Sequence, residues 1–212
     1  MKDVATYYAP DMPSRTSASS RILRRLFYRR KTVRVAKELL GKILVRKLGG
    51  TRLEGIIVET EAYRGHDDAA SHAYRGPTAR NQVMFGEPGH AYVYFTYGMH
   101  YCLNVTTEPA GQPGAVLLRA VQPTRGIAEM KKRRRTEQVR VLSNGPAKLT
   151  QAFAVNKELN GYDLTDGGAL YITEPSLVEP VRVAVSTRIG IKTSAEKRWR
   201  FFVKDNQFVS GQ

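Results

Sequence analysis

Cysteine is nearly absent from this chain, since Cys102 is the only one among 212 residues. A single cysteine cannot form an internal disulfide framework, ligate an iron–sulfur cluster or supply a CxxC zinc site. The chain also lacks any run of about 18 apolar residues, which a transmembrane helix would require. Residues 1–20 contain no apolar core of the kind found in signal peptides. We therefore expect an intracellular protein from a reducing compartment, with no membrane partner.

Acidic residues are scarce relative to basic ones. Lysine and arginine total 34 and aspartate and glutamate total 19, which gives a formal net charge of +15 and a pI near 10.1. So large an excess indicates attraction to a polyanion, most often nucleic acid or an anionic membrane surface. The basic residues concentrate in segments 21–34 and 131–135. Either segment alone fits a solvated helix face or a disordered arm, but the two together favour phosphate binding.

Length and composition predict one folded domain. The hydrophobic fraction of 42% is enough for a core in a chain of this size. Residues 1–20 are polar and rich in proline, serine and threonine, so we expect a disordered N-terminal arm there and a single domain over residues 21–212.

Hydrophobic periodicity predicts interleaved helices and strands. Helices are expected at 33–40, 124–135 and 146–155, the last capped by Asn144 with a proline in its first turn. Strands are expected at 42–48, 53–59, 90–96, 102–106, 115–121, 170–173, 181–186 and 198–204. Hairpin spacing outweighs the longer spacing of β-α-β units. The predicted fold class is therefore α/β, more narrowly α+β, with a mainly antiparallel sheet and flanking helices.

Reactive side chains are densest in residues 58–68, which His72 follows closely. An apolar strand precedes this segment and a loop follows it, so we expect Glu59 and Glu61 where the strand becomes loop. Side chains alternate along a strand, so both carboxylates and Tyr63 would share one face. This pattern favours a catalytic base beside an aromatic stacking platform. The alternative is a charged strand end whose glutamates pair with lysine or arginine.

Tyrosines mark a second candidate feature. Tyr92 and Tyr94 alternate with apolar residues on the strand expected at 90–96, and Tyr97 and Met99 follow where the chain turns. An enzyme that acts on one base of a nucleic acid must hold that base between flat side chains and fill the gap it leaves. Tyr63 and Tyr94 could form the walls of such a pocket. The alternative is a tyrosine stripe on a half-buried sheet.

Taken in order, these residues resemble the alkyladenine (3-methyladenine) DNA glycosylases, from about Val35 to the C-terminus. A dozen ordered matches at near-constant gaps carry the resemblance. They are Val58-Glu59-Thr60-Glu61-Ala62-Tyr63, His72, Thr78-Ala79-Arg80-Asn81, Met84-Phe85, Tyr92-Val93-Tyr94, Tyr97-Gly98-Met99, Asn104, Leu117-Leu118-Arg119 and Gly145-Pro146-Ala147-Lys148-Leu149.

The resemblance implies a role for each matched residue. Glu61 would be the general base that activates water to attack the sugar C1′, and Arg119 would help to hold that water and the adjoining phosphate. The remaining roles divide into three groups. Tyr63, His72, Tyr94, Asn104 and Leu117 would bind the flipped base, with Asn104 disfavouring guanine; Tyr97 and Met99 would form the wedge; and Arg80, Asn81 and Lys148 would contact the DNA backbone.

The resemblance also implies a compact α/β domain with a curved antiparallel sheet and duplex DNA containing a damaged purine as the substrate. We expect a monomer without cofactor, in a bacterial cytoplasm and associated with the nucleoid. No metal site is expected, because the spacing of His66, Asp67, Asp68 and His72 matches no standard site. Two departures from the family pattern concern substrate breadth: a longer loop at residues 108–114, and Tyr74 in place of a smaller residue.

Three alternative functions stay open at this point. A non-catalytic nucleic-acid-binding module would keep the basic segments and aromatics, but would not need Glu61 beside the pocket. A metal-dependent nuclease would cut the backbone and fail in chelator. A bifunctional glycosylase with lyase activity would need a lysine nucleophile, and Lys148 is the only lysine in a matched motif.

Overall fold

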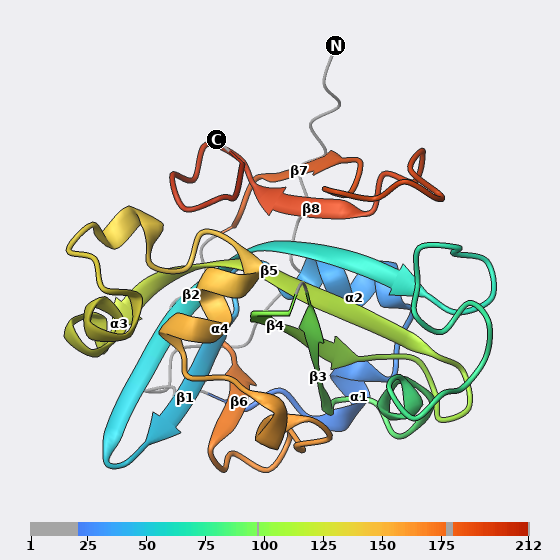
Figure 1. Cartoon of the computed structure of the whole chain (residues 1–212), viewed down its shortest axis with the longest axis horizontal. Helices are drawn as coiled ribbons and strands as arrows, with labels where there is room; N and C mark the ends of the chain where they lie inside the picture. The colour runs from blue at the N-terminus through green and yellow to red at the C-terminus, as the bar shows by residue number, and fades with distance from the viewer. Residues whose placement is uncertain (1–20, 97, 177–179, 212) are drawn as a thin grey trace.

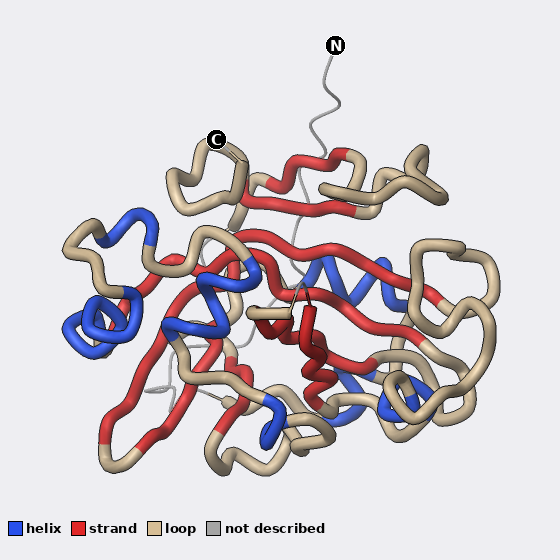
Figure 2. Tube along the Cα trace, viewed as in Figure 1, coloured by secondary structure: helices blue, strands red, loops and turns tan. Residues whose placement is uncertain are grey.

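Two long strands, β2 (Thr51–Arg64) and β5 (Gly114–Arg125), pair antiparallel along the middle of the computed structural model. The structure describes residues 21–96, 98–176 and 180–211. Both strands belong to one sheet with the order β3-β4-β5-β2-β1-β6, and a β7–β8 hairpin joins it because β8 also pairs with β2. The sheet curls, and helices lie around it (Figures 1 and 2).

The remaining elements are short. In chain order they are α1 (Arg25–Tyr28), α2 (Thr32–Glu38), β1 (Ile43–Leu48), η1 (Gln82–Phe85), β3 (Ala91–Thr96), β4 (His100–Thr106), α3 (Ile127–Arg134), η2 (Val139–Val141), α4 (Pro146–Ala152), η3 (Lys157–Leu159), β6 (Leu170–Thr173), β7 (Val183–Ser186) and β8 (Arg200–Val203). All pairings between these described strands are antiparallel. The predicted α+β class and the curved antiparallel sheet are confirmed.

Strand β2 is longer than the sequence predicted. The expected strand ended at Glu59, but β2 continues to Arg64, so Glu59 and Glu61 lie within a strand and not at its junction with a loop. The extension has a physical cause: β5 pairs with one edge of this half of β2 and β8 pairs with the other. Backbone groups on both edges are therefore hydrogen-bonded, and residues 57–62 are buried. The site consequently rests on the most enclosed part of the sheet.

Helices cover the sheet and close the core. Helix α2 packs on β2 and β5, α4 packs on β4 and β5, and α3 packs on α4. In Figure 1 α4 lies in front of the long strands and α2 behind them. Tyr28, Phe153 and Phe201 are among the largest fully buried side chains, and all three belong to one hydrophobic cluster.

The predicted cap of α4 is wrong. The N-cap position is Gly145, and no side chain caps the helix there. Asn144 instead accepts a hydrogen bond from Lys148 at 2.9 Å between Oδ1 and Nζ. Pro146 does occupy the first turn, where its missing N–H costs nothing.

Two expectations fall on residues that the structure does not describe: the N-terminal arm at 1–20 and the wedge residue Tyr97. Within the described ranges, none of the helices is long and apolar enough to cross a membrane.

Candidate active site

One row of cross-strand partners connects most of the predicted site. Tyr92 on β3 is opposite Asn104 on β4, and Asn104 is opposite Leu117 on β5. Leu117 is in turn opposite Glu61 on β2, which is opposite Arg200 on β8. Directly opposed residues project from the same face of a sheet, and neighbouring strands lie about 4.8 Å apart. The fold therefore brings five distant segments of the chain together on one face.

Glu59 and Glu61 are fully buried side chains with different surroundings. Glu59 accepts four hydrogen bonds, which come from Arg119 Nε (3.1 Å), Arg200 Nε (2.6 Å), and both the backbone N–H (2.7 Å) and hydroxyl (2.9 Å) of Ser210. An ionised carboxylate has about four acceptor positions. Glu59 thus has four protein donors, three of them on Oε1, and it anchors the C-terminal segment to β2.

Glu61 keeps acceptor capacity. Its Oε1 accepts the backbone N–H of Ile189 at 2.8 Å and lies 3.4 Å from Arg119 Nη1, and its Oε2 accepts the Tyr63 hydroxyl at 2.7 Å. Three donors leave room for one more, such as a water molecule. The two glutamates therefore differ in their partners: Glu59 has four protein donors, two of them from Ser210, whereas Glu61 has three, one of which is the Tyr63 hydroxyl.

Arg119 occupies an irregular position in β5. Thr60 pairs with Leu118, but Glu59 pairs with Ala120, so Arg119 is the extra residue of β5 and has no partner on β2 in this register. Such β-bulges re-aim a side chain and are frequent beside active sites. Here the guanidinium reaches both carboxylates. Burial disfavours its charge, but the carboxylates of Glu61 and Glu59 outweigh that effect, and the pKa of Arg119 is raised.

An aromatic hollow of about 100 Å³ lies next to these residues. Its lining comprises Tyr63, Ala70, His72, Met84, Tyr92, Tyr94, Asn104, Ala115 and Ile191. The structure thus brings together four of the predicted base-binding residues: Tyr63, His72, Tyr94 and Asn104. Burial, and then the adjacent charge of Glu61, raise the pKa of the Tyr63 hydroxyl well above its usual range. That hydroxyl therefore stays a donor to Glu61 and links the hollow to the carboxylate.

His72 is held at the edge of the hollow. Its Nδ1 lies 2.8 Å from the Tyr92 hydroxyl, and its ring meets that of Tyr94 edge to face at 4.6 Å between centroids. Partial burial of the imidazole, and then the positive charge of Arg80, lower the pKa of His72 below its usual value. The ring is consequently neutral at pH 7.

Other predicted residues lie outside the hollow. Leu117 is buried within β5 between Asn104 and Glu61, and does not line the hollow. Met99 lies in the turn between β3 and β4, and its side chain is 69% exposed. Met99 is therefore an exposed apolar side chain on a hairpin, whereas Leu117 is a buried residue.

The three predicted backbone contacts differ from one another. Arg80 is exposed, with its guanidinium 5.1 Å from the Tyr94 ring centroid. Asn81 is buried, and its amide is used within its own loop, donating to the carbonyls of His72 (2.7 Å) and Gly76 (3.0 Å). The side chain of Asn81 therefore supports the backbone of His72, and its contact with the DNA backbone stays a prediction. Lys148 is half-buried and bonded to its neighbour Asn144.

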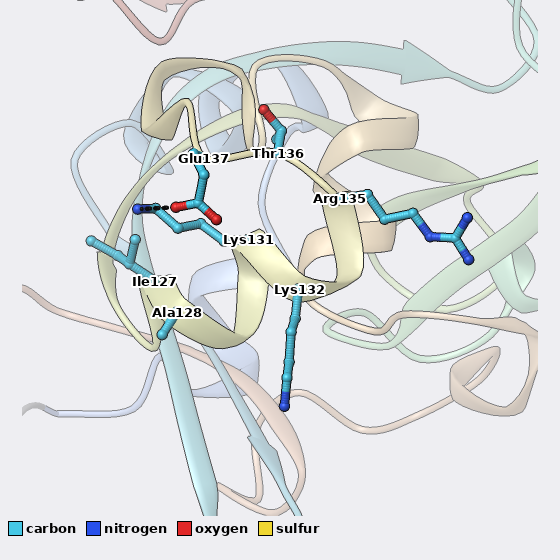
Figure 3. Close-up of a pocket in the computed structure, with 7 residues that line it drawn as sticks. All are labelled: Ile127, Ala128, Lys131, Lys132, Arg135, Thr136 and Glu137. Atoms are coloured by element: carbon cyan, nitrogen blue, oxygen red, sulfur yellow. Dashed lines mark hydrogen bonds and ion pairs between the residues drawn. The ribbon is translucent and has the colours of Figure 1, made fainter.

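A second hollow, of about 590 Å³, lies on α3 (Figure 3). Lys131 is paired there with Glu137 at 2.9 Å between Nζ and Oε2, whereas Lys132 and Arg135 are exposed and extend away from the helix. Strand β5 runs on past Leu117 to Arg125 before α3 begins. At about 3.3 Å per residue, this places the hollow on the order of 25 Å from Leu117. It is therefore separate from the glutamate cluster.

The basic segment 131–135 is only partly available for phosphate. Arg134 donates to the Leu142 carbonyl at 3.1 Å and also to Gln151 on α4. Burial lowers the pKa of this arginine. Arg134 ties α3 to α4, so within this segment Lys132 and Arg135 are the exposed basic residues.

The acidic and histidine residues near the hollow have other partners. Asp68 pairs with Arg188, and Asp67 with Arg64 at 3.2 Å. In the described part of the chain, no group of three or more histidine, cysteine or acidic side chains could hold a metal ion.

The C-terminal segment supplies residues that sequence reasoning missed. Ile189, Arg200 and Ser210 all donate to Glu59 or Glu61. Two of these contacts use backbone N–H groups, which no side-chain pattern reveals. Arg200 was included in an expected strand at 198–204, but nothing in the local sequence connects it to a glutamate 141 positions away.

Comparison with known proteins agrees with this geometry. The family model for methylpurine-DNA glycosylase (MPG) matches residues 26–207. The chain belongs to this family. The resemblance found in the sequence is thereby confirmed, and with it the enzyme class, a DNA glycosylase of base excision repair.

Bacterial relatives cover nearly the whole chain. Three proteins are each named "Putative 3-methyladenine DNA glycosylase". The one from Carboxydothermus hydrogenoformans is 53% identical over 189 residues, which are 89% of this chain and 98% of the relative. Those from Prosthecochloris aestuarii and Chlorobium luteolum are 49% and 47% identical over 185 residues, covering 87% of this chain and 88% and 94% of theirs.

Proposed function

We propose that this methylpurine-DNA glycosylase family member is monofunctional and excises alkylated or deaminated purines from duplex DNA, with 3-methyladenine, hypoxanthine and ethenoadenine as candidate lesions. The observation that carries the proposal is Glu61, a buried carboxylate with one open acceptor position. It lies beside Arg119 and is bonded to Tyr63, which lines the aromatic hollow.

The chemistry follows from that environment. A base must leave the helical stack before an enzyme can act on it, and Tyr63 and Tyr94 offer flat surfaces on which a flipped purine can stack. Cleavage of the N-glycosidic bond develops positive charge on the sugar. Glu61 orients a water and takes its proton as the oxygen bonds to C1′, while the base departs with the electrons of the broken bond. The negative charge of Glu61 also opposes the charge on the sugar.

Selectivity is assigned to Asn104 and His72. Asn104 is fixed by its own amide, which donates to the Tyr92 carbonyl at 3.0 Å. A rigid amide in the lining of the hollow would crowd the 2-amino group that guanine carries and that adenine-derived bases and hypoxanthine lack. His72 is neutral and bonded to Tyr92, so it adds a polar group without adding a charge that would repel a cationic lesion.

A monofunctional reaction fits the lining residues. A lyase step needs an amine nucleophile, and no lysine is among the described residues that line the hollow. We also propose that one chain suffices for activity, because Glu61, Arg119 and the aromatic lining all come from a single chain. We propose in addition that it acts on nucleoid DNA in a bacterial cytoplasm. Met99 and Tyr97 are proposed as the wedge.

The test compares wild type, Glu61→Gln and Glu54→Gln on a duplex with one hypoxanthine, in chelator, followed by alkali to reveal abasic sites. Glu54 lies on the same strand and pairs with Arg52 and Arg125, away from the hollow. Wild type and Glu54→Gln should give alkali-dependent cleavage at equal rates. Glu61→Gln should be slower by at least about 100-fold, because the general base is lost, while its affinity for the lesion duplex is retained.

Three outcomes would contradict the proposal. Activity of Glu61→Gln near the wild-type level would remove Glu61 as the base. Absence of cleavage by wild type on hypoxanthine, ethenoadenine and 3-methyladenine alike, with tight and salt-sensitive binding of DNA, would favour the non-catalytic binding module. Cleavage without alkali, with trapping of the protein on DNA by borohydride, would indicate a lyase instead.

A further inference from the structure

A second charged pair lies beneath the site and takes no part in the reaction proposed above. Arg188 and Asp68 have no exposed side-chain area, and they form a two-pronged contact of 2.6 Å from Nη1 to Oδ2 and 2.7 Å from Nη2 to Oδ1. The pair joins two segments that are 120 positions apart in the chain. Asp68 lies in the loop between β2 and His72, and Arg188 follows β7.

Stability alone does not account for this pair. Removing two charges from water costs several kcal/mol per ion, and replacing buried ion pairs by apolar residues is often neutral or stabilising. A planar guanidinium nevertheless has one property that an apolar pair lacks, which is that its donors fix several acceptors in a set geometry. We therefore consider which groups Arg188 holds in place.

Arg188 holds the end of β2. Its Nη1 donates to the carbonyl of Ala62 at 3.0 Å, and its guanidinium carbon lies 4.6 Å from the centroid of the Tyr63 ring. Ala62 and Tyr63 directly follow Glu61. Because Arg188 is buried and does not line the hollow, it supports Tyr63 from outside the hollow.

Arg188 also fixes the segment that contacts Glu61, the proposed general base. The next residue, Ile189, donates its N–H to Glu61 Oε1 at 2.8 Å. Arg188 additionally donates to the carbonyl of Ser194 at 3.3 Å, which closes the loop that contains Ile189 and Ile191. One side chain therefore touches the strand of Glu61, the ring of Tyr63 and the loop that binds Glu61.

We propose that Arg188, held by Asp68, is a positioning residue that aligns Glu61 and Tyr63 for the reaction. This role rests on the function proposed above. It acts through the Ile189 N–H and the Tyr63 ring, and needs no contact with DNA. A carboxylate that loses such alignment still binds lesion DNA through the rest of the site, but it places its water poorly, and small displacements are costly in rate.

The test uses Arg188→Lys and the double variant Arg188→Gln/Asp68→Asn, in which neither charge is left buried without its partner. The matched control is Arg182→Gln, which removes an exposed ion pair with Asp205 in the same C-terminal hairpin. Three quantities are measured: single-turnover excision of hypoxanthine, affinity for the same duplex, and Tm.

The double variant should excise between about 10- and 100-fold more slowly, with affinity for the lesion duplex changed less than twofold. Arg188→Lys should excise faster than the double variant but more slowly than wild type, because lysine keeps the charge but lacks the planar, two-pronged donor geometry of the guanidinium. Arg182→Gln should match wild type in all three measurements. A defect that appears in affinity and not in rate would contradict the positioning role, since loss of general binding is what a merely structural pair would cause.

The failures of the two proposals are distinguishable. If wild type releases no base from any of the lesions, the proposed function fails. If wild type excises the base and both Arg188 variants do so at the wild-type rate, only the positioning role fails. If the double variant does not fold, Arg188→Lys decides alone: full wild-type activity overturns the role, and slowed excision with unchanged affinity supports it.

Discussion

Two glutamates on the same strand show how environment separates residues of one chemical type. Glu59 and Glu61 are both fully buried, and both contact Arg119. Glu59 has four protein donors, of which Ser210 supplies two, whereas Glu61 has three and is bonded to Tyr63 at the hollow. Their sequence context, Val-Glu-Thr-Glu-Ala, does not show this difference, because several of the donors come from the distant C-terminal segment. The chemistry of a residue here depends on which of its acceptor positions the fold has already used.

His72 offers a test of electrostatics at the same scale. Arg80 is exposed, and its charge contributes to the lowered pKa of His72. Replacing Arg80 with glutamine removes a cation that disfavours the imidazolium, so the pKa of His72 should rise toward its usual value. The measurement is an NMR titration of the histidine ring protons, with the His72 signal identified by its loss in His72→Asn.

The effect of Arg80 should weaken as salt is added, because its charge is exposed to solvent and is screened. An unaltered titration of His72 in Arg80→Gln would mean that burial alone sets its pKa, and that Arg80 is not an electrostatic neighbour of the hollow.

At the scale of whole elements, the sequence predicted strands better than it predicted their irregularities. The strand at 170–173 matches β6 in full, and those expected at 90–96 and 102–106 overlap β3 and β4 closely. Alternation of side chains is a local signal, so it survives in a single sequence. The register shift at Arg119 and the extension of β2 to Arg64 depend on neighbouring strands, which no local pattern contains.

The residues of the candidate site also fall into two groups, those that a local motif predicts and those that depend on the assembled fold. Glu61, Tyr63 and the tyrosines of β3 come from short motifs, and so could be named in advance. Arg188, Ile189 and Ser210 act through long-range contacts, two of them through backbone groups. They have no motif of their own. A residue whose role is to hold another residue is defined by the fold, and it becomes visible only when the strands are assembled.

At Gly55 the strands β2 and β5 leave no room for a side chain. A Cβ placed there would lie 2.3 Å from Cγ1 of Val121 and 2.8 Å from the carbonyl oxygen of Gln122, and the register shifts at the same point. Gly55→Ala should therefore lower the free energy of unfolding by about 1–3 kcal/mol, because the backbone of β5 cannot move away without strain. Urea unfolding followed by circular dichroism measures the loss.

The matched control for Gly55 is Gly86→Ala. A Cβ at Gly86 meets its nearest neighbour, the Val83 carbonyl oxygen, at 3.5 Å, which is ordinary contact. Its backbone is already extended, so alanine fits without strain. A loss for Gly55→Ala no greater than that for Gly86→Ala would show that the two long strands separate easily at this point.

For the molecule as a whole, the distribution of positive charge suggests how DNA lies on it. Arg80 flanks the strand that leads to the β3–β4 turn, and its guanidinium reaches toward the Phe95 carbonyl. On the other side of that turn, α4 packs on β4 and carries Lys148, and α3 packs on α4. Exposed Lys132 and Arg135 therefore extend a basic track that starts beside the hollow. Segment 21–34 lies on α1 and α2, and α2 packs on β2 and β5.

This arrangement predicts the salt dependence of binding. Each phosphate neutralised by a cation contributes about −0.9 to the slope of log K against log salt. Lys132→Gln/Arg135→Gln should therefore make the slope shallower by up to about 1.8, and should weaken damaged and undamaged duplexes equally, because phosphate contacts carry no base information. The control, Arg24→Gln/Arg29→Gln on the N-terminal block, should leave the slope unchanged. Fluorescence anisotropy over a salt series measures both variants, and an equal loss in the control would place the N-terminal block on DNA as well and overturn the proposed track.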